Sequence, residues 1–296
     1  MKIKKILITG VSGLLGSSMA KQYKDNYEVV GSYFSNKVAF DGVRTFGIDL
    51  NNEVEAKSLI LEEKPNLIIH TAALANVDLC EKDPELARKL NIDQAVFMAE
   101  ISRELNIQYV FISTDQLFGG SKPMRSEKDP LNPINEYSRT KAIAEEKIRD
   151  VYTYKSLIIR TNFYGNGCGS KASFSDWALS NIKNKESQNY YSNIYYTPIL
   201  MKLLNEYIIK LVELEASGIY NVCGSDRISK YDFVMKLANA FDLPNKFIIK
   251  SEYMIGDLSA IRPTDLSISC RKLEKVLRVQ VPSIDEQLKF LKEEYE

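Results

Sequence analysis

The chain has 296 residues, 45% of them hydrophobic and 26% charged, and its 39 lysines and arginines balance its 39 aspartates and glutamates. This length allows one large domain or two closely joined ones, and the even charge favours neither nucleic acid nor an anionic membrane as a partner. No apolar run approaches the ~20 residues that span a bilayer. The four cysteines have no C-x-x-C spacing, so we expect reduced thiols in a cytoplasmic protein, with no disulfide framework and no metal site.

Short apolar segments rich in isoleucine and valine predict the strands of a buried sheet. They are nearly continuous rather than alternating, which is typical of strands covered on both faces. We expect these strands at residues 3–9, 28–33, 43–48, 67–71, 109–114 and 156–161. Longer segments between them predict helices at 14–24, 53–63, 83–105 and 137–151. Strands that alternate with helices predict an α/β fold with a doubly wound parallel sheet, Rossmann-like in its connections.

The pattern changes after Gly165, where a loop rich in Gly, Asn and Ser is expected up to residue 170. Beyond it we expect helices at 174–184, 199–214, 229–242 and 283–294, and one more strand at 218–223. We therefore predict an NAD(P)-binding domain over residues 1–165, to which 197–222 returns. A smaller substrate-binding cap, mostly C-terminal, would be formed by 166–196 and 223–296.

A glycine-rich turn follows the first predicted strand and opens the first predicted helix. It reads G-V-S-G-L-L-G over residues 10–16, a G-x-x-G-x-x-G spacing rather than G-x-G-x-x-G. In this context backbone N–H groups and the helix N-terminus face a pyrophosphate, which favours a dinucleotide site over a purely structural turn. We expect cofactor contacts from Gly10, Ser12, Gly13, Leu14, Leu15 and Gly16.

The second predicted strand indicates which nicotinamide cofactor is bound. NAD-selective sites often place an acidic residue at its end to hold the ribose 2′-hydroxyl. Here the strand runs into G-S-Y-F-S-N-K at 31–37, with no acid. Ser32, Asn36 and Lys37 could instead receive a 2′-phosphate, so NADPH is favoured and NADH stays possible. A surface turn without a cofactor role is the alternative for Lys37.

The segment N-E-Y-S-R-T-K at 135–141 places Tyr137 and Lys141 four residues apart, on one face of a predicted helix. Thr114 ends a predicted strand 23 residues before Tyr137, so the three side chains can converge at the carboxyl edge of the sheet. A phenol with a pKa near ~10 is a poor proton donor or acceptor at neutral pH until a cation lowers that value. An ordinary surface tyrosine and lysine are the alternative. The only histidine, His70, is interpreted as a strand-end residue with a local partner.

Seven segments, in their order along the chain, resemble the extended short-chain dehydrogenase/reductases, and among these the dTDP-4-dehydrorhamnose reductase family. They are GVSGLLG (10–16), HTAALANVDLCE (70–81), LNIDQA (90–95), STDQLFGG (113–120), YSRTK (137–141), IRTNFYG (159–165) and RPTDLSIS (262–269). The resemblance covers nearly the whole chain. It implies an NADPH-dependent reductase of a nucleotide-activated 4-keto-6-deoxy sugar, a homodimer whose product feeds a surface polysaccharide or glycan.

The resemblance also implies roles for single residues. Tyr137 would protonate the substrate oxygen, Lys141 would lower the pKa of Tyr137 and hold the nicotinamide ribose, and Thr114 would hydrogen-bond the same substrate oxygen. Asn91 would support Lys141 through the helix and ordered water. Further cofactor contacts are implied for Asp49 and Leu50, beside the adenine, and for the strand-end residues Thr71, Ala72, Ala73 and Leu74.

On the substrate side the resemblance implies contacts from Thr114, Gln116, Phe163 and Arg262, the last as a bidentate donor to the diphosphate. Gln116 replaces the usual Tyr, Phe163 the usual Trp and Gly119 the usual Asp, so the sugar can differ. Related dehydratases carry Thr-Asp-Glu where this chain has Thr-Asp-Gln at 114–116, which disfavours water elimination because Gln is no base. Two sets of residues stay open: Arg160 is either a buried ion-pair partner or a site residue, and the tyrosines at 190, 191, 195 and 196 either stack on the ligand or form cap core.

Two rival functions stay open on the same scaffold. The β subunit of methionine adenosyltransferase resembles this family, binds the cofactor and serves as a partner protein, so a non-catalytic regulatory subunit is one alternative. A nucleotide-sugar epimerase, which would keep NAD bound and need no net reductant, is the other. Consumption of the cofactor separates the reductase from both.

Overall fold

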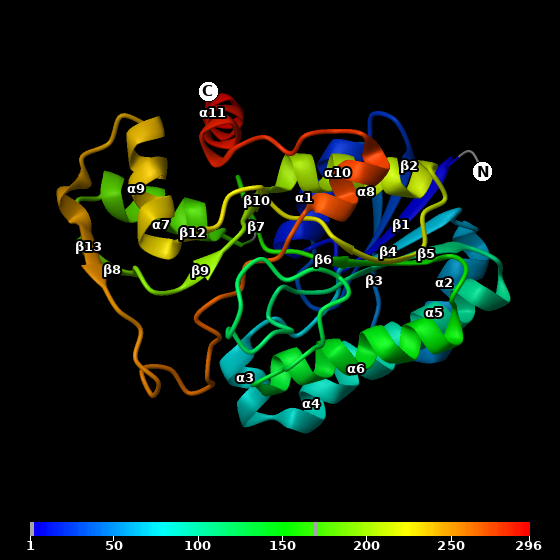
Figure 1. The fold of residues 1–296 in the computed structure, drawn as a ribbon. Helices are drawn as coiled ribbons and strands as arrows, with labels where there is room; N and C mark the ends of the chain where they lie inside the picture. The colour runs from blue at the N-terminus through cyan, green and yellow to red at the C-terminus, as the bar shows by residue number, and fades with distance from the viewer. Residues whose placement is uncertain (1–2, 168–170) are drawn as a thin grey trace.

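The computed structural model describes residues 3–167 and 171–296, and its centre is a seven-stranded parallel sheet (Figure 1). The strand order is β11-β6-β5-β4-β1-β2-β3. The strands are β1 (Lys5–Thr9), β2 (Glu28–Tyr33), β3 (Val43–Gly47), β4 (Leu67–His70), β5 (Gln108–Ile112), β6 (Ser156–Arg160) and β11 (Gly218–Asn221). The predicted doubly wound α/β fold is confirmed, and the last predicted strand ends two residues earlier than expected.

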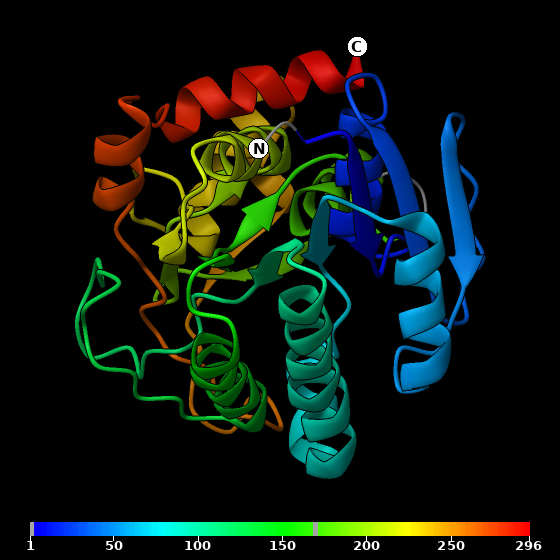
Figure 2. The same ribbon diagram turned by 90° about the vertical axis from the view of Figure 1, so that its right-hand side faces the viewer.

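Helices cover both faces of this sheet, as Figure 2 shows from the side. One face carries α2 (Glu53–Glu63), α5 (Gln94–Glu104) and α6 (Glu136–Val151). The other carries α1 (Leu14–Tyr23), α8 (Met201–Glu213) and α10 (Arg271–Leu277). Successive residues of one strand enter different cores: Ile6 and Ile8 join the α1 side, whereas Leu7 joins the α2 side. This alternation with apolar residues on both sides explains why the strands read as continuous apolar runs.

The helix predicted over 83–105 is interrupted in the structure. It begins as α4 (Pro84–Arg88), widens into a π-helical turn at Lys89–Asp93 and continues as α5. Before it, α3 (Val77–Lys82) was not expected; Asn76 caps this helix by accepting a hydrogen bond from the Leu79 N–H. Asp83 caps α4 in the same way through the Leu86 N–H. The two caps lie seven residues apart, so a separate short helix forms immediately before the predicted one begins.

A second group of elements lies beyond one end of the sheet, on the left in Figure 1, around its own apolar core. Its helices are α7 (Phe174–Lys183), α9 (Lys230–Ala240) and α11 (Ile284–Tyr295), with a 3-10 turn at Asn245–Phe247. Short strands pair β7 (Phe163–Tyr164) with β10 (Ile199–Leu200), β9 (Tyr195–Tyr196) with β12 (Ile228–Ser229), and β8 (Gln188–Tyr191) with β13 (Ile248–Ser251). Because residues 199 and 200 form β10, α8 starts later than predicted.

The division into a cofactor domain and a cap stays a prediction. The apolar side chains of Ile268, Leu273 and Val281 belong to the core beside the sheet, although the predicted cap includes them. The last three residues of the expected 165–170 loop lie outside the described residues. Within the described ranges, no helix is both long and apolar enough to cross a membrane.

Candidate active site

The turn between β1 and α1 requires glycine at position 10. The φ angle of Gly10 is +69°, in the left-handed region, and a Cβ there would lie 2.8 Å from the backbone of Ala72. Gly16 is crowded too, since a Cβ would lie 2.5 Å from the Gly10 carbonyl oxygen. No side chain caps the N-terminus of α1 at Gly13. The first N–H groups of α1 are therefore suited to a phosphate ligand.

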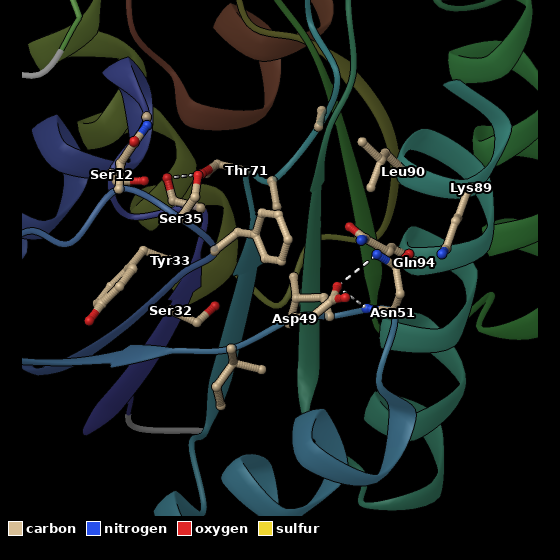
Figure 3. A pocket seen from close by; sticks show the side chains of 18 of the residues that line it. Ser12, Ser32, Tyr33, Ser35, Asp49, Asn51, Thr71, Lys89, Leu90 and Gln94 are labelled. Atoms are coloured by element: carbon tan, nitrogen blue, oxygen red, sulfur yellow. Dashed lines mark hydrogen bonds between the residues drawn. The ribbon is translucent and has the colours of Figure 1, made fainter. Parts of the chain in front are cut away.

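A cavity of about 510 Å³ opens beside this turn, at the carboxyl ends of the strands. Figure 3 shows Ser12, Ser35 and Thr71 at one end of it and Lys89, Leu90 and Gln94 across from them, with Asp49 and Asn51 between. Asn51 donates a hydrogen bond from Nδ2 to Asp49 Oδ1 at 2.7 Å, which fixes these two side chains relative to each other. The predicted cofactor residues that line this first cavity are Gly10, Ser12, Gly13, Asp49, Leu50, Thr71, Ala72 and Ala73.

Several predicted cofactor residues lie outside this lining. They are Leu14, Leu15, Gly16, Lys37, Leu74, Asn91, Tyr137 and Lys141. Leu15 is buried in the core of the α1 side, and Lys37 is exposed. Ser32 and Asn36, the other two residues considered for a 2′-phosphate, do line the cavity.

Other lining residues were not foreseen, and they are Tyr33, Phe34, Ser35, Ile48, Asn51, Leu86, Lys89, Leu90, Gln94 and Lys171. Those at 33–35, 48 and 51 lie at or just after the ends of predicted strands, so their positions in the sequence could have indicated that they line the cavity. Those at 86–94 come from the interrupted helix, and nothing in their local sequence indicates that they face the turn at Gly10.

Thr114, Tyr137 and Lys141 converge at the junction of β5 and α6. All three are nearly buried, with exposures of 5%, 8% and 1%. The helix starts where it does because Asn135 and Ser138 form a reciprocal capping box. The Thr114 hydroxyl lies within reach of a hydrogen bond to the phenol of Tyr137, and this proximity acts on the pKa of that phenol. Lys141 donates from Nζ to the Ile112 carbonyl oxygen at 2.6 Å, so the ammonium is fixed at the end of β5.

The pKa of Tyr137 does not follow the expectation that Lys141 lowers it. Burial raises the pKa of Tyr137 well above its usual value, and only the hydrogen bond with Thr114 acts against this. Burial also lowers the pKa of Lys141 to about 7, although the charge of Glu145 opposes that shift. The expectation failed because it counted the cation but not the desolvation that both groups share. Tyr137 is therefore a neutral phenol in this structure.

Asn91 lies in the π-helical turn and contacts α6 directly. Its Oδ1 accepts a hydrogen bond from the Leu74 N–H at 2.8 Å. Its Nδ2 donates to the Leu74 carbonyl oxygen at 3.2 Å and to Thr140 Oγ1 at 3.1 Å. Asn91 therefore ties the loop after β4 to the residue before Lys141. π-Helical turns occur frequently at functional sites, and this one aims the amide at α6.

Arg160 is a buried ion-pair partner, which settles the question left open by the sequence. Its Nη2 lies 2.6 Å from Glu145 Oε2, and both side chains are almost completely buried. Ser113 also donates a hydrogen bond to Glu145 Oε1 at 2.6 Å. Because Glu145 lies one helical turn after Lys141 and Ser113 precedes Thr114, this pair fixes α6 against β5 and β6.

His70 also behaves as expected of a strand-end residue. Its Nδ1 lies 2.9 Å from the hydroxyl of Thr9. Burial, helped by the charge of Lys141, lowers the pKa of His70 to about 3. The imidazole is neutral at physiological pH. Within the described part of the chain, no group of three or more His, Cys, Asp or Glu side chains could hold a metal ion.

A second cavity, of about 310 Å³, adjoins the Thr114 segment on the side of α7 and α9. Its lining residues are Gln116, Asn162, Phe174, Trp177, Asn189, Tyr190, Tyr191, Ile194, Lys230, Leu258, Arg262 and Leu266. Of the predicted substrate residues, Gln116 and Arg262 are present in this lining. Phe163 is absent from it because it pairs with Ile199 in the β7–β10 ladder and packs on the core beside the sheet.

Arg262 and the tyrosines are placed by specific partners. The guanidinium of Arg262 donates to Asp78 Oδ2 at 2.9 Å and to the Ala260 carbonyl oxygen at 2.8 Å. Tyr190 and Tyr191 line the second cavity, and Tyr196 is buried in the core beneath it. The tyrosine-rich segment thus supplies both rings that line the cavity and rings that belong to the apolar core.

Comparison with known proteins gives a match over almost the whole chain. The model of the "RmlD substrate binding domain" family matches residues 4–296. A spore coat polysaccharide biosynthesis protein, SpsK, of Bacillus subtilis is 31% identical over 275 residues, 92% of this chain and 91% of that protein. A probable low-salt glycan biosynthesis reductase, Agl14, of Haloferax volcanii is 27% identical over 289 residues, 96% of each chain. Methionine adenosyltransferase 2 subunit beta of Xenopus laevis is 27% identical over 285 residues, 92% of this chain and 82% of that protein.

Solved structures share the fold. The dTDP-4-dehydrorhamnose reductase of Yersinia enterocolitica superposes with a TM-score of 0.85 at 26% identity, over 99% of this chain and 100% of that one. The Bacillus anthracis dTDP-4-dehydrorhamnose reductase in complex with NADP gives a TM-score of 0.87 at 24% identity, with the same coverage. The second likeness, being so distant in sequence, concerns the fold alone.

Proposed function

The chain belongs to the RmlD substrate-binding domain family, and from that membership we propose that it is an NADPH-dependent reductase of a nucleotide-activated 4-keto-6-deoxy sugar. Two relatives support this: Agl14 is named as a glycan biosynthesis reductase and SpsK as a polysaccharide biosynthesis protein. The product would enter a polysaccharide or glycan. A cytoplasmic location and a homodimer are part of the same proposal, and sedimentation analysis tests the dimer.

One observation carries the proposal: the buried junction of Thr114, Tyr137 and Lys141. A buried phenol near a threonine hydroxyl, with a buried lysine one turn later on the same helix, is an arrangement suited to protonating a carbonyl oxygen. The segment that holds Thr114 continues into Gln116, which lines the second cavity. A substrate in that cavity can therefore present its keto group to the junction.

The first cavity fits a nicotinamide dinucleotide. Gly10 permits the tight turn against Ala72, and the uncapped N-terminus of α1 that follows this turn suits a pyrophosphate. When bound, this cofactor supplies the hydride. Ser32 and Asn36, with no acidic residue at the end of β2, support NADPH over NADH.

The residues of the chain would handle the proton and the charge. As the keto oxygen becomes negative, Tyr137 donates its phenolic proton to that oxygen, and the Thr114 hydroxyl hydrogen-bonds the same atom. The Lys141 ammonium, fixed by the Ile112 carbonyl oxygen, stabilises the phenolate that remains. Asn91 and Glu145 hold α6 in place, and burial excludes water from the transfer.

A regulatory subunit is the second candidate, because methionine adenosyltransferase 2 subunit beta of Xenopus laevis matches 92% of this chain. It would bind the cofactor without consuming it. The raised pKa of Tyr137 is compatible with this function too, since an unreactive phenol stays protonated.

The deciding experiment follows the oxidation of NADPH and NADH optically with dTDP-, UDP-, GDP- and CDP-4-keto-6-deoxy sugars, for the native chain and Tyr137→Phe. We expect turnover that prefers NADPH and falls about 100-fold or more in the variant, the loss typical of a missing general acid. Cofactor binding without turnover on all four nucleotides would reject the reductase and favour the regulatory subunit.

A further inference from the structure

Arg262 reaches the second cavity from a short segment, residues 260–262, that we call the strap. In Figure 1 the strap belongs to the orange chain that runs from β13 towards α3. Asp78 of α3 holds it at both ends: Oδ1 accepts a hydrogen bond from the Ala260 N–H and Oδ2 accepts one from Arg262 Nη2, each at 2.9 Å. The guanidinium also donates from Nη1 to the Ala260 carbonyl oxygen at 2.8 Å. One carboxylate therefore fixes both the strap and the side chain that it presents.

The start of α6 supports the strap from another side. Asn135, the N-cap residue of α6, donates from Nδ2 to the Ile261 carbonyl oxygen at 2.9 Å. Ala260 is 1% exposed and packs in the small apolar cluster that contains Tyr137. The strap therefore cannot shift without disturbing the start of α6, and Asp78 holds Arg262 against a rigid support.

Arg262 keeps hydrogen-bond donors for a ligand. A guanidinium carries five N–H donors in a planar fork, and the contacts with Asp78 and Ala260 use two of them. Among the described residues, no acceptor pairs with the other three donors. The side chain is 17% exposed and lines the second cavity. The described residues of this lining include a second cation, Lys230, and no acidic residue, so a phosphate group suits the free donors.

Asp78 is ionised in this arrangement. The hydrogen bond from the Ala260 N–H lowers the pKa of Asp78 most and the charge of Arg262 lowers it further, whereas desolvation opposes both. Because 41% of the Asp78 side chain is exposed, the ion pair contributes little to stability. Its effect is on order, since a guanidinium that is already oriented loses less conformational freedom when a ligand binds.

We propose that Asp78 is a positioning residue for the diphosphate of the nucleotide sugar. It does not touch the substrate; it orients the guanidinium of Arg262 so that the free N–H donors face the phosphates. The sequence indicates Arg262 as a phosphate ligand but gives no sign of Asp78, which lies 184 residues away along the chain. This inference rests on the proposed function for the identity of the ligand.

The test is calorimetry on the full-length protein with Asp78→Asn, Arg262→Gln and the double variant. The amide of Asp78→Asn can still accept the Ala260 N–H, but it offers no second carboxylate oxygen to Arg262. Asp242→Asn is the matched control, because it removes an exposed ion pair with Lys292 that lines neither cavity. The probes are dTDP, UDP, GDP and CDP, with NADP⁺ as a ligand of the first cavity.

We expect Asp78→Asn to weaken binding of the diphosphate that the native chain prefers by about 2- to 10-fold, the cost of ordering one long side chain. Arg262→Gln should weaken it by about 10- to 100-fold. In the double variant the loss should equal that of Arg262→Gln within about twofold, because Asp78 acts through Arg262. NADP⁺ affinity should stay unchanged in every variant, as should diphosphate affinity in Asp242→Asn.

Native diphosphate affinity in Asp78→Asn, or losses that multiply in the double variant, would overturn the role of Asp78. A parallel fall in NADP⁺ affinity would overturn it too, since that result indicates general structural damage. These measurements are independent of turnover. The predicted pattern without any NADPH oxidation would reject the reductase and keep the positioning role, whereas turnover with multiplying losses would do the reverse. If no diphosphate binds to the native chain, both are rejected.

Discussion

The two cavities are built in opposite ways. One side of the first is formed by short segments at the ends of adjacent strands, such as Gly10 beside Ala72, where backbone and small side chains form the wall, and side chains such as Lys89 and Gln94 complete the lining. The second is lined by aromatic and long polar side chains from six or more separate segments between residues 116 and 266. A wall made of backbone depends on the sheet, whereas a wall made of side chains can change without disturbing it. Cofactor recognition is therefore tied to the fold, and substrate recognition is free to vary.

The buried Glu145–Arg160 ion pair lines neither cavity. We expect its loss to weaken ligand binding in both. Glu145→Gln leaves the Arg160 guanidinium buried beside a neutral partner, so we expect the free energy of unfolding to fall by about 3–5 kcal/mol. Urea denaturation measures this loss, and the affinities for cofactor and nucleotide sugar should fall together. Glu145→Gln combined with Arg160→Met removes the buried charge and should recover part of the stability. A double variant less stable than the single one would contradict this account.

Gly10→Ala should separate the cavities. The substitution places a Cβ 2.8 Å from the Ala72 backbone at a φ of +69°. The turn must shift to relieve a strain of about 1–3 kcal/mol, and we expect the displaced N–H groups to lose ~10- to 100-fold in NADPH affinity, measured by fluorescence titration, with nucleotide-sugar binding unchanged. Gly218→Ala is the control, because Gly218 has a φ of +82° but nothing within 4 Å of its Cβ. If both variants bind NADPH equally well, the close approach at Gly10 has no role.

The sequence could predict those features that lie within one segment. The turn at Gly10, the start of α6 before Tyr137 and the strands of the seven-stranded sheet, to within one or two residues, each depend on local spacing, whereas the short paired strands outside that sheet were not predicted. It could not predict that Lys89 faces the first cavity or that Lys230 faces the second, because these contacts form only when separate elements pack together. The burial of Tyr137 could not be predicted for the same reason, and burial is what raises the pKa of this residue.

His70 makes the cofactor side of the sheet sensitive to acid. Its pKa is lowered from 6.5 to about 3 in the folded chain, so the unfolded chain binds more protons between these values and stability falls as the pH drops below 6.5. This site alone should remove about 2 kcal/mol by pH 5. Urea denaturation at pH 7 and pH 5 should show a smaller difference for His70→Asn than for the native chain. An equal difference in both would mean that other groups cause the acid loss.

Trp177 tests the second cavity with the smallest expected effect. It lines this cavity, its ring centroid lies 5.5 Å from that of Tyr190, and 42% of its surface is exposed. An aromatic contact of about 0.5–1.5 kcal/mol implies that Trp177→Leu weakens nucleotide-sugar binding by ~2- to 10-fold. Tyr154→Leu, at an 88% exposed ring that lines neither cavity, should change nothing. NADPH affinity should stay constant in both variants. If NADPH affinity falls together with nucleotide-sugar affinity in Trp177→Leu, the two cavities are coupled. Substrate recognition could then not change without affecting cofactor binding.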